Sequence, residues 1–541
     1  MKQEARPSDR RSQVFVFLTL AFLAALYSVR LGAGSLWDNS EPQYGEIVKE
    51  MLRSGDWLTL HKDLQPWYVH PPLWFWTAAL SAKIFGLTEF ALRFPSAVFG
   101  VASGYAIYLA GRRLYGETTG IVAALALGVG LEFLVMSRLA IQDTMLVCAM
   151  TVSTFWGWFA LRDSDSKALW IAAIATALGT LIKGPVALVL PGLTLIAWAA
   201  WTRSWKSFAG LPWLGAISLY VVIAGAWFAA ETAARGPHFL YAYFGLSNVS
   251  RFLSPYENQP GPIYYYVPIL IVGFFPFIAF VPQALARAWR SGGEDGKFLI
   301  AAAVVPFVFF SIAQTKLPNY IEASFPALSI MTGETIANAI AQRSMRSLRG
   351  ALFALIAAVV VLAAGVYFYG HAHASGLMVT LSPSLALLGW LIVPIAVLTF
   401  VLAIRLDRPW IAPLGLSTMM AAFIGVVVFS ILPQIEATAK PMKAMSADVM
   451  RVWRPGERIC FDGVHQGFSL DYYTNGPPIT SVGHNTDDVP PRRYFATPQP
   501  AVCVVSPDAY TDLTDRGIKL ALVEKTPTLW LVTYDKSITI H

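Results

Sequence analysis

Long apolar stretches recur along this chain from one end to the other. Of its 541 residues, 56% are hydrophobic and 13% are charged, whereas a soluble domain carries about 25% charged residues. Because roughly 20 consecutive apolar residues are enough for a helix to cross a bilayer, these stretches predict a mainly α-helical, polytopic membrane bundle. About thirteen spans are expected, near residues 13–30, 95–111, 118–136, 144–161, 168–182, 185–201, 211–230, 264–286, 298–313, 321–340, 351–370, 384–404 and 409–432.

Basic residues in the loops predict which side of the membrane each loop faces. Lys and Arg accumulate in cytoplasmic loops. A basic cluster precedes the first span, and similar clusters occur in every second loop after it. We therefore expect these loops and the N-terminus to be cytoplasmic. These loops explain the net charge of +7, and no basic stripe with interleaved aromatic residues indicates nucleic-acid binding. The short loops on the opposite side keep only a few cations, each a candidate for a functional role: Arg138, Lys183, Arg235, Arg251 and Lys316.

Two segments do not follow the pattern of short loops. Residues 31–94 form a long first extracytoplasmic connection, in which we expect two helices lying at the membrane interface, Glu46–Leu52 and Leu73–Phe85. The C-terminal part of the chain is polar, with short strand-like runs between Pro, Gly and Asp residues. An odd number of spans puts this part outside the cytoplasm. We therefore expect a membrane domain at 1–438 and a small soluble α/β or α+β domain at 439–541.

Two further features depend on the extracytoplasmic environment. The N-terminal segment combines a basic start with an apolar core, and we expect an uncleaved anchor rather than a cleaved signal peptide. Cys460 and Cys503 both lie in strand-like runs of the outer domain. A disulfide between them and a pair of buried free thiols both remain open.

The stretch LWDNSEPQY places two acids, Asp38 and Glu41, just beyond the first expected span. Ionised carboxylates at the edge of a bilayer are costly to desolvate, so such a pair indicates a functional role. The alternative is helix capping, in which Asp38, Asn39 and Ser40 cap a helix that opens near Pro42, with Glu41 favourably placed beside its dipole. The two roles are compatible.

Six motifs follow one another along the chain: LWDNSEPQYGEIVKEMLRSGDWLTLHKDLQPWYVHPPLWFWTAAL, FGLTEFALRFPSAVFG, SRLAIQDTML, LIKGPVALVLP, NVSRFL and KLPNYIEASFPAL. In this order they resemble the GT-C membrane glycosyltransferases. Within these, the chain is most similar to bacterial protein O-mannosyltransferase-like enzymes and to the aminoarabinose transferases that modify lipid A. The resemblance implies transfer of a sugar from a polyprenyl-phosphate carrier to a lipid, glycan or protein acceptor, with inversion. The site would face the periplasmic side of a bacterial inner membrane.

Such a reaction needs a carboxylate that accepts the acceptor's proton and a polar cluster that stabilises the departing phosphate. Where the family has an Asp-Glu pair, this chain has Ser40-Glu41, while Asp38 is retained two residues earlier. We expect Glu41 to be the base, with Asp38 as the alternative and Ser40 as a supporting residue.

For the phosphate, the resemblance points to Arg251 in NVSRFL and Tyr320 in KLPNY, and the chemistry adds Lys316 in the same loop. Arg can bind phosphate through two hydrogen bonds, and Lys acts as a point charge. Taken alone, each residue is also typical of a span end that reaches the membrane interface.

His70 in YVHPPLWFW stands where the lipid A enzymes have Lys, and Val69 replaces the Glu beside it. Gln43 and Asn248 stand where those enzymes have Arg and His. A metal site built on the Glu at position 69 and the His at position 248 is therefore missing. These differences predict a place outside the aminoarabinose branch. His70 is still a candidate to bind phosphate, ligate a metal or accept a proton, and a turn residue before Pro71 is the structural alternative. Enzymes of this type sometimes use a divalent metal ion, and metal dependence stays open.

Asp143 in SRLAIQDTML begins an expected span on the outer side, and Lys183 in LIKGP faces the same side. We expect Asp143 to orient a first-loop residue or the acceptor, or to cap its helix. Lys183 is expected to pair with Asp143 or with the phosphate. His371 and His373 resemble a metal pair, but no acidic or cysteine partner is nearby in the sequence.

Two other classes of protein remain as alternatives. The number of spans alone would suit a transporter or flippase, but transporters usually place their charged groups near the membrane midplane rather than at the outer helix ends. A catalytically silent GT-C-like protein is suggested by Ser40, Gln43 and Asn248.

Overall fold

The computed structural model divides into two compact units that interleave in sequence. The membrane unit comprises Met1–Gly32 and Tyr68–Ile431, and the sheet unit comprises Ala33–Trp67 and Leu432–His541. The described residues are 10–36, 40–254, 259–372, 377–438, 442–463, 467–474, 477, 479–483, 488–497, 499–526 and 529–534.

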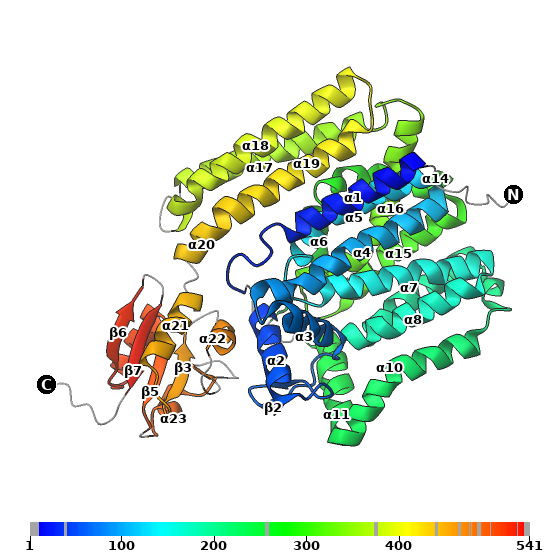
Figure 1. Ribbon diagram of the computed structural model, residues 1–541. Helices are drawn as coiled ribbons and strands as arrows, with labels where there is room; N and C mark the ends of the chain where they lie inside the picture. Colours follow the sequence, from blue (N-terminus) through cyan, green and yellow to red (C-terminus); the bar gives the residue numbers. More distant parts are fainter. Residues whose placement is uncertain are drawn as a thin grey trace. The chain divides into compact units, whose positions relative to one another are not determined.

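The membrane unit is built from apolar helices (Figure 1). Within the described residues, eight helices are long and apolar enough to cross a membrane, or nine if the pair Tyr266–Gly273 and Phe277–Ser291, bent by 107°, forms one span. In chain order, the apolar helices are α1 (Arg10–Ser28), α3 (Leu73–Phe85), α4 (Glu89–Tyr115), α5 (Glu117–Gly128), α7 (Asp143–Asp163), α8 (Ser166–Lys183), α9 (Val186–Thr202), α10 (Trp213–Arg235), α15 (Gly293–Ile312), α16 (Phe325–Ala341), α17 (Arg349–Ala372), α18 (Leu377–Arg405) and α19 (Ile411–Val426).

Each expected span coincides with one helix or with two or three consecutive helical pieces, so the prediction of a helical membrane bundle is confirmed. The pieces that complete broken spans and loops are α6 (Leu131–Met136), η1 (Trp205–Phe208), α11 (His238–Leu240), η2 (Tyr241–Ser250), α12 (Arg251–Leu253), α13 (Tyr266–Gly273), η3 (Phe277–Phe280), α14 (Val281–Ser291), η4 (Pro318–Ser324) and η5 (Val427–Ile431). Helices α17, α18 and α19 run alongside one another (Figure 1).

Glycines bring helices α4, α5 and α16 close together. A Cβ atom on Gly111 of α4 would lie 3.0 Å from the Cα atom of Gly120 in α5. A Cβ atom on Gly333 of α16 would lie 2.8 Å from the carbonyl oxygen of Thr119. Small residues at such crossings let membrane helices pack backbone against backbone.

The sheet unit combines the first-loop segment with the C-terminal part of the chain. Helix α2 (Ser40–Ser54) is followed by a two-stranded hairpin, β1 (His61–Lys62) and β2 (Gln65–Pro66). A five-stranded sheet has the order β4-β3-β5-β7-β6, in which β4, β3 and β5 are parallel and β7 and β6 are antiparallel to their neighbours. The remaining elements are α20 (Leu432–Thr438), α21 (Met442–Val452), β3 (Arg458–Asp462), α22 (Gly467–Tyr473), β4 (Ile479–Val482), α23 (Pro491–Tyr494), β5 (Ala501–Val505), α24 (Pro507–Asp515), β6 (Ala521–Lys525) and β7 (Trp530–Tyr534). The small C-terminal sheet domain is therefore confirmed.

Strand β3 is buried on both faces, because its alternate side chains enter two different hydrophobic clusters. Ile459 and Phe461 pack in one cluster and Cys460 in the other. Cys460 is paired in register with Cys503 of β5, and the two form a disulfide. Of the two alternatives that the sequence left open, the structure has the disulfide.

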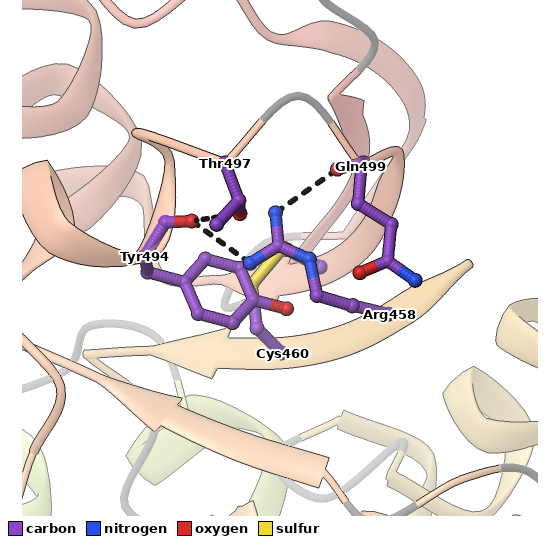
Figure 2. The surroundings of a disulfide bond; sticks show 6 residues. Arg458, Cys460, Tyr494, Thr497 and Gln499 are labelled. Atoms are coloured by element: carbon purple, nitrogen blue, oxygen red, sulfur yellow. Dashed lines mark hydrogen bonds between the residues drawn. A yellow bond between two sulfur atoms is a disulfide. The ribbon is translucent and has the colours of Figure 1, made fainter. Parts of the chain in front are cut away.

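Figure 2 shows what surrounds this disulfide. The Arg458 guanidinium lies 4.1 Å from the centroid of the Tyr494 ring and donates hydrogen bonds to the carbonyl oxygens of Tyr494 (2.8 Å) and Gln499 (2.9 Å). The Thr497 hydroxyl donates to the same Tyr494 carbonyl (3.0 Å). These bonds tie the loop before β5 to the first residue of β3.

Candidate active site

The membrane unit contains a cavity of about 420 Å³, which we call the membrane-unit cavity. Segments that are far apart in sequence contribute its polar lining: His70, Asp143, Lys183, Ser247, Asn248, Arg251, Thr315, Asn319 and Tyr320. Apolar side chains form the rest of the wall, among them Val69, Met150, Val189, Phe244, Phe252 and Phe309. A mainly apolar pocket with a few convergent polar groups is the usual form of a ligand site.

An ion pair between α7 and α8 lies in this wall. Asp143 is the first residue of α7 and Lys183 the last residue of α8, and Lys183 Nζ lies 2.5 Å from Asp143 Oδ1. Each charge also lies at the helix end where the dipole favours it. The residue that flanks the start of α7 is Gln142, and its side chain makes no capping bond. The predicted pairing of Lys183 with Asp143 is confirmed.

Lys183 also faces Tyr320. Its Nζ atom lies 5.3 Å from the centroid of the Tyr320 ring, which packs against Phe310 with a centroid distance of 4.9 Å. Tyr320 belongs to η4, a 3₁₀ helix whose start at Pro318 has no donor to satisfy. This packing holds the Tyr320 ring beside the Lys183 ammonium.

Arg251 enters the cavity from an irregular helix. The ten residues of η2 have π-helical bonding, a geometry that often occurs at functional sites. Arg251 follows directly as the first residue of α12, and the Asn248 side-chain amide donates to the Tyr243 carbonyl (2.7 Å). Asn248 is thus engaged with backbone at the position where the lipid A enzymes have His.

His70 lies in the loop before α3 and lines the same cavity. Burial lowers the pKa of its imidazole well below the ordinary value, and the charges of Lys183 and Arg251 lower it further. A neutral imidazole can accept a proton or ligate a metal, whereas binding an anion would favour the charged imidazolium. Among the described residues, no three His, Cys, Asp or Glu side chains are grouped as metal ligands would be.

Lys316 points elsewhere. Its Nζ atom donates to the carbonyl oxygens of Phe310 (2.9 Å) and Ser311 (2.6 Å) at the end of α15, and the side chain is buried. Arg138 acts similarly, since its guanidinium donates to three carbonyl oxygens at the end of α1, at 2.7 to 2.8 Å. Both cations stabilise helix C-termini. A phosphate-binding role for Lys316 stays a prediction that this geometry does not favour.

The predicted base belongs to the sheet unit. Helix α2 begins at Ser40, so the expected helix near Pro42 is confirmed, and Glu41 in its first turn is fully buried. Asp38 lies outside the described residues, as does His373 of the pair His371 and His373. The catalytic roles of Glu41, Asp38 and Ser40 stay predictions.

Two carboxylates were missed by the sequence analysis. Glu132 of α6 and Glu322 of η4 are buried, and neither has a hydrogen-bond partner for its carboxylate among the described residues. Glu132 packs against the α13 end, where a Cβ atom on Gly273 would meet its Oε2 atom. Both lie inside expected spans, and an acid within an apolar run is itself a signal of function.

The polar lining and the apolar wall together suit an amphipathic anion. Lys183 and Arg251 supply cationic donors, Tyr320 offers a hydroxyl donor, and Asp143 offsets part of the positive charge. A phosphate could be held by these groups while an apolar chain lies against the wall. Polyprenyl phosphate has this chemistry.

Known proteins are similar to this chain in sequence and in fold. The family model of dolichyl-phosphate-mannose-protein mannosyltransferases matches residues 69–228. An undecaprenyl phosphate-α-4-amino-4-deoxy-L-arabinose arabinosyl transferase of Edwardsiella ictaluri is 31% identical over 323 residues, 58% of each chain. The enzyme of the same name from an Enterobacter species is 29% identical over 448 residues, 79% of each chain. The chain thus spans less than two thirds of the Edwardsiella relative.

The crystal structure of ArnT from Cupriavidus metallidurans bound to undecaprenyl phosphate has a TM-score of 0.82 to this chain. The match covers 97% of this chain and 99% of ArnT at 22% identity. Both of these relatives are named as aminoarabinose transferases. The predicted place of this chain outside that branch is not supported by them and stays a prediction. The resemblance found in the motifs is confirmed: the chain is an integral membrane protein with the fold of the GT-C glycosyltransferases and sequence similarity to their aminoarabinose and mannosyl transferase members.

Proposed function

We propose that this protein transfers a sugar from a polyprenyl-phosphate carrier to an acceptor outside the cytoplasm, with inversion. The membrane-unit cavity is the main support for this proposal. Lys183, Arg251 and Tyr320 line it with polar groups that suit a phosphate, and its apolar wall suits a lipid chain. The protein would sit in a bacterial inner membrane, with this cavity and the sheet unit on the periplasmic side. That compartment lacks nucleotide sugars, so a lipid-borne donor fits it.

The reaction requires few protein groups. An acceptor oxygen forms a bond to the anomeric carbon while the bond from that carbon to the phosphate oxygen breaks. Glu41, with Asp38 as the alternative, accepts the proton of the acceptor hydroxyl. The departing phosphate stays on the lipid, and Lys183 and Arg251 stabilise its charge.

The test is acceptor-dependent release of free polyprenyl phosphate by the purified full-length protein, followed by mass spectrometry. The donor panel should include undecaprenyl phosphate-α-4-amino-4-deoxy-L-arabinose, after the relatives, and polyprenyl-phosphate mannose, after the family model. Membrane lipids, glycans and periplasmic proteins serve as acceptors. Failure of every donor in the wild type would support a catalytically silent protein.

Two conservative variants test the base. Glu41→Gln and Asp38→Asn keep the size of each side chain and remove its basicity. We expect a loss of about 100-fold or more in kcat for the residue that acts as base. Equal activity in the wild type and both variants would remove this assignment.

A further inference from the structure

Within the sheet unit, hydrogen bonds hold the segment that precedes Glu41. The backbone N–H and the hydroxyl of Ser35 donate to Glu436 Oε2 (3.1 and 2.9 Å). The Leu36 N–H donates to the Tyr473 hydroxyl (2.8 Å). The partners are 401 and 437 residues apart in sequence, so the C-terminal part of the chain fixes the start of the first loop.

Lys49 makes the corresponding contact on the other side of Glu41. Its side chain is buried, and its Nζ atom donates to the carbonyl oxygens of Asp471 (2.7 Å), Tyr472 (3.0 Å) and Thr474 (3.2 Å). These carbonyls lie at the C-terminal end of α22, where helical partners are lacking and a cation is favoured. Three carbonyl oxygens and the Glu46 carboxylate therefore surround the Lys49 ammonium, which has three donors.

Direct packing joins the same two helices. A Cβ atom on Gly45 of α2 would lie 2.8 Å from the Tyr472 ring of α22 and 3.1 Å from Leu36 Cδ1. Lys49 Nζ lies 5.7 Å from the centroid of that ring and forms an ion pair with Glu46, one turn earlier in α2. Helix α2 therefore contacts α22 without room for a side chain between them.

We propose that Lys49 is a positioning residue for the transfer reaction and that the C-terminal sheet domain is the support that fixes α2, and with it Glu41. The inference rests on the proposed function, because it takes Glu41 as the base. Glu41 and Lys49 lie eight residues apart on one helix, about 12 Å along its axis. A displacement of about 1 Å at a reacting group can lower the rate about 100-fold, so a loosened α2 would reduce turnover.

The experiment uses the full-length protein and two readouts. Lys49→Met removes the three hydrogen bonds and keeps a long apolar stem, while Lys49→Arg keeps the charge. Tyr473→Phe and Gly45→Ala disturb the same attachment without a change of charge. Lys519→Met is the control, since Lys519 is an exposed lysine of the same unit, between α24 and β6.

We expect Lys49→Met to lower kcat about tenfold or more while the KM for the donor changes less than about twofold, because residues of the membrane unit line the donor cavity. Lys49→Arg should recover part of kcat. Gly45→Ala and Tyr473→Phe should lower kcat in the same way, and Lys519→Met should not. Hydrogen–deuterium exchange should rise in peptides from α2 in Lys49→Met and stay unchanged in α3.

Unchanged kcat and unchanged α2 exchange in Lys49→Met would overturn the proposal, as would a loss confined to the KM for the donor. If Lys49→Met does not fold, Gly45→Ala and Tyr473→Phe decide by the same two readouts. If the wild type transfers no sugar, the proposed function fails, and the attachment of α2 is then decided by exchange alone. Equal α2 exchange in the wild type and these variants contradicts it.

Discussion

Two lysines close to the membrane-unit cavity should respond differently when their charge is removed. Lys183 lines the cavity and pairs with Asp143, whereas Lys316 donates to two carbonyls at the end of α15. Both were predicted to bind phosphate from their positions in the sequence. The geometry favours phosphate binding by Lys183, which stays a prediction, and helix stabilisation by Lys316.

The size of each effect follows from the bonds lost. A hydrogen bond from a charged group contributes about 1.5–3 kcal/mol, so Lys183→Met should weaken binding of polyprenyl phosphate about 10- to 150-fold. The same change leaves the buried Asp143 carboxylate without its ion-pair partner, at a cost of about 3–5 kcal/mol in stability. The double variant Lys183→Met/Asp143→Asn removes that charge and should recover much of the stability but not the affinity.

Lys316→Met should show the opposite pattern. It loses about 1.5–3 kcal/mol of stability for each of its two bonds, while its affinity for polyprenyl phosphate stays within about twofold of wild type. Affinity is measured by direct binding of undecaprenyl phosphate to the full-length protein in detergent, and stability by thermal melting of the same samples. Equal losses of affinity in Lys183→Met and Lys316→Met would refute this assignment, and so would unchanged affinity in the Lys183→Met/Asp143→Asn variant.

Three further outcomes are expected. Replacing Cys460 and Cys503 by Ala opens a link across 43 residues and should cost about 4 kcal/mol; melting with and without reductant checks this, and reductant should not affect the variant. Burial raises the pKa of Glu46 to about 7, above its ordinary value of 4.5, so its contribution to stability is lost as the pH rises from about 4.5 to 7, and Glu46→Gln should flatten the melting temperature over that window. Because burial lowers the pKa of His70, donor affinity should not change with its protonation between about pH 6 and 8. Donor binding is measured across this range in the wild type and in His70→Gln. An inflection that is present in the wild type and lost in His70→Gln would contradict a neutral imidazole.

Elements with strong local signals were predicted closely. Helix α3 has the expected bounds Leu73–Phe85, because its apolar block lies between Pro72 and Gly86. Strand β3 coincides with the expected run Arg458–Asp462, where β-branched, aromatic and cysteine side chains alternate between two clusters. The pairing of Lys183 with Asp143 could also be predicted, since each ends or begins a helix on the same side of the membrane.

Contacts between distant segments could not be predicted in this way. The direction of Lys316 depends on the path by which its loop returns to the end of α15, which residue type and span position do not reveal. The bonds from Lys49 to the end of α22 join positions more than 420 residues apart, and a buried lysine on an amphipathic helix has no distinguishing local pattern. Glu132 and Glu322 had a signal, an acid inside an apolar run. Glu132 lies outside the six motifs, and Glu322 lies in KLPNYIEASFPAL, where Lys316 and Tyr320 were the residues singled out.

In the proposed reaction, this membrane protein transfers a sugar from a polyprenyl-phosphate carrier with Glu41, or Asp38, as base. The most direct measurement is the rate of acceptor-dependent polyprenyl phosphate release by the full-length wild type, Glu41→Gln and Asp38→Asn, with the same donor and acceptor. We expect release by the wild type and a loss of about 100-fold or more in one of the two variants. The same rate in all three proteins, or no release from any donor by the wild type, would contradict it.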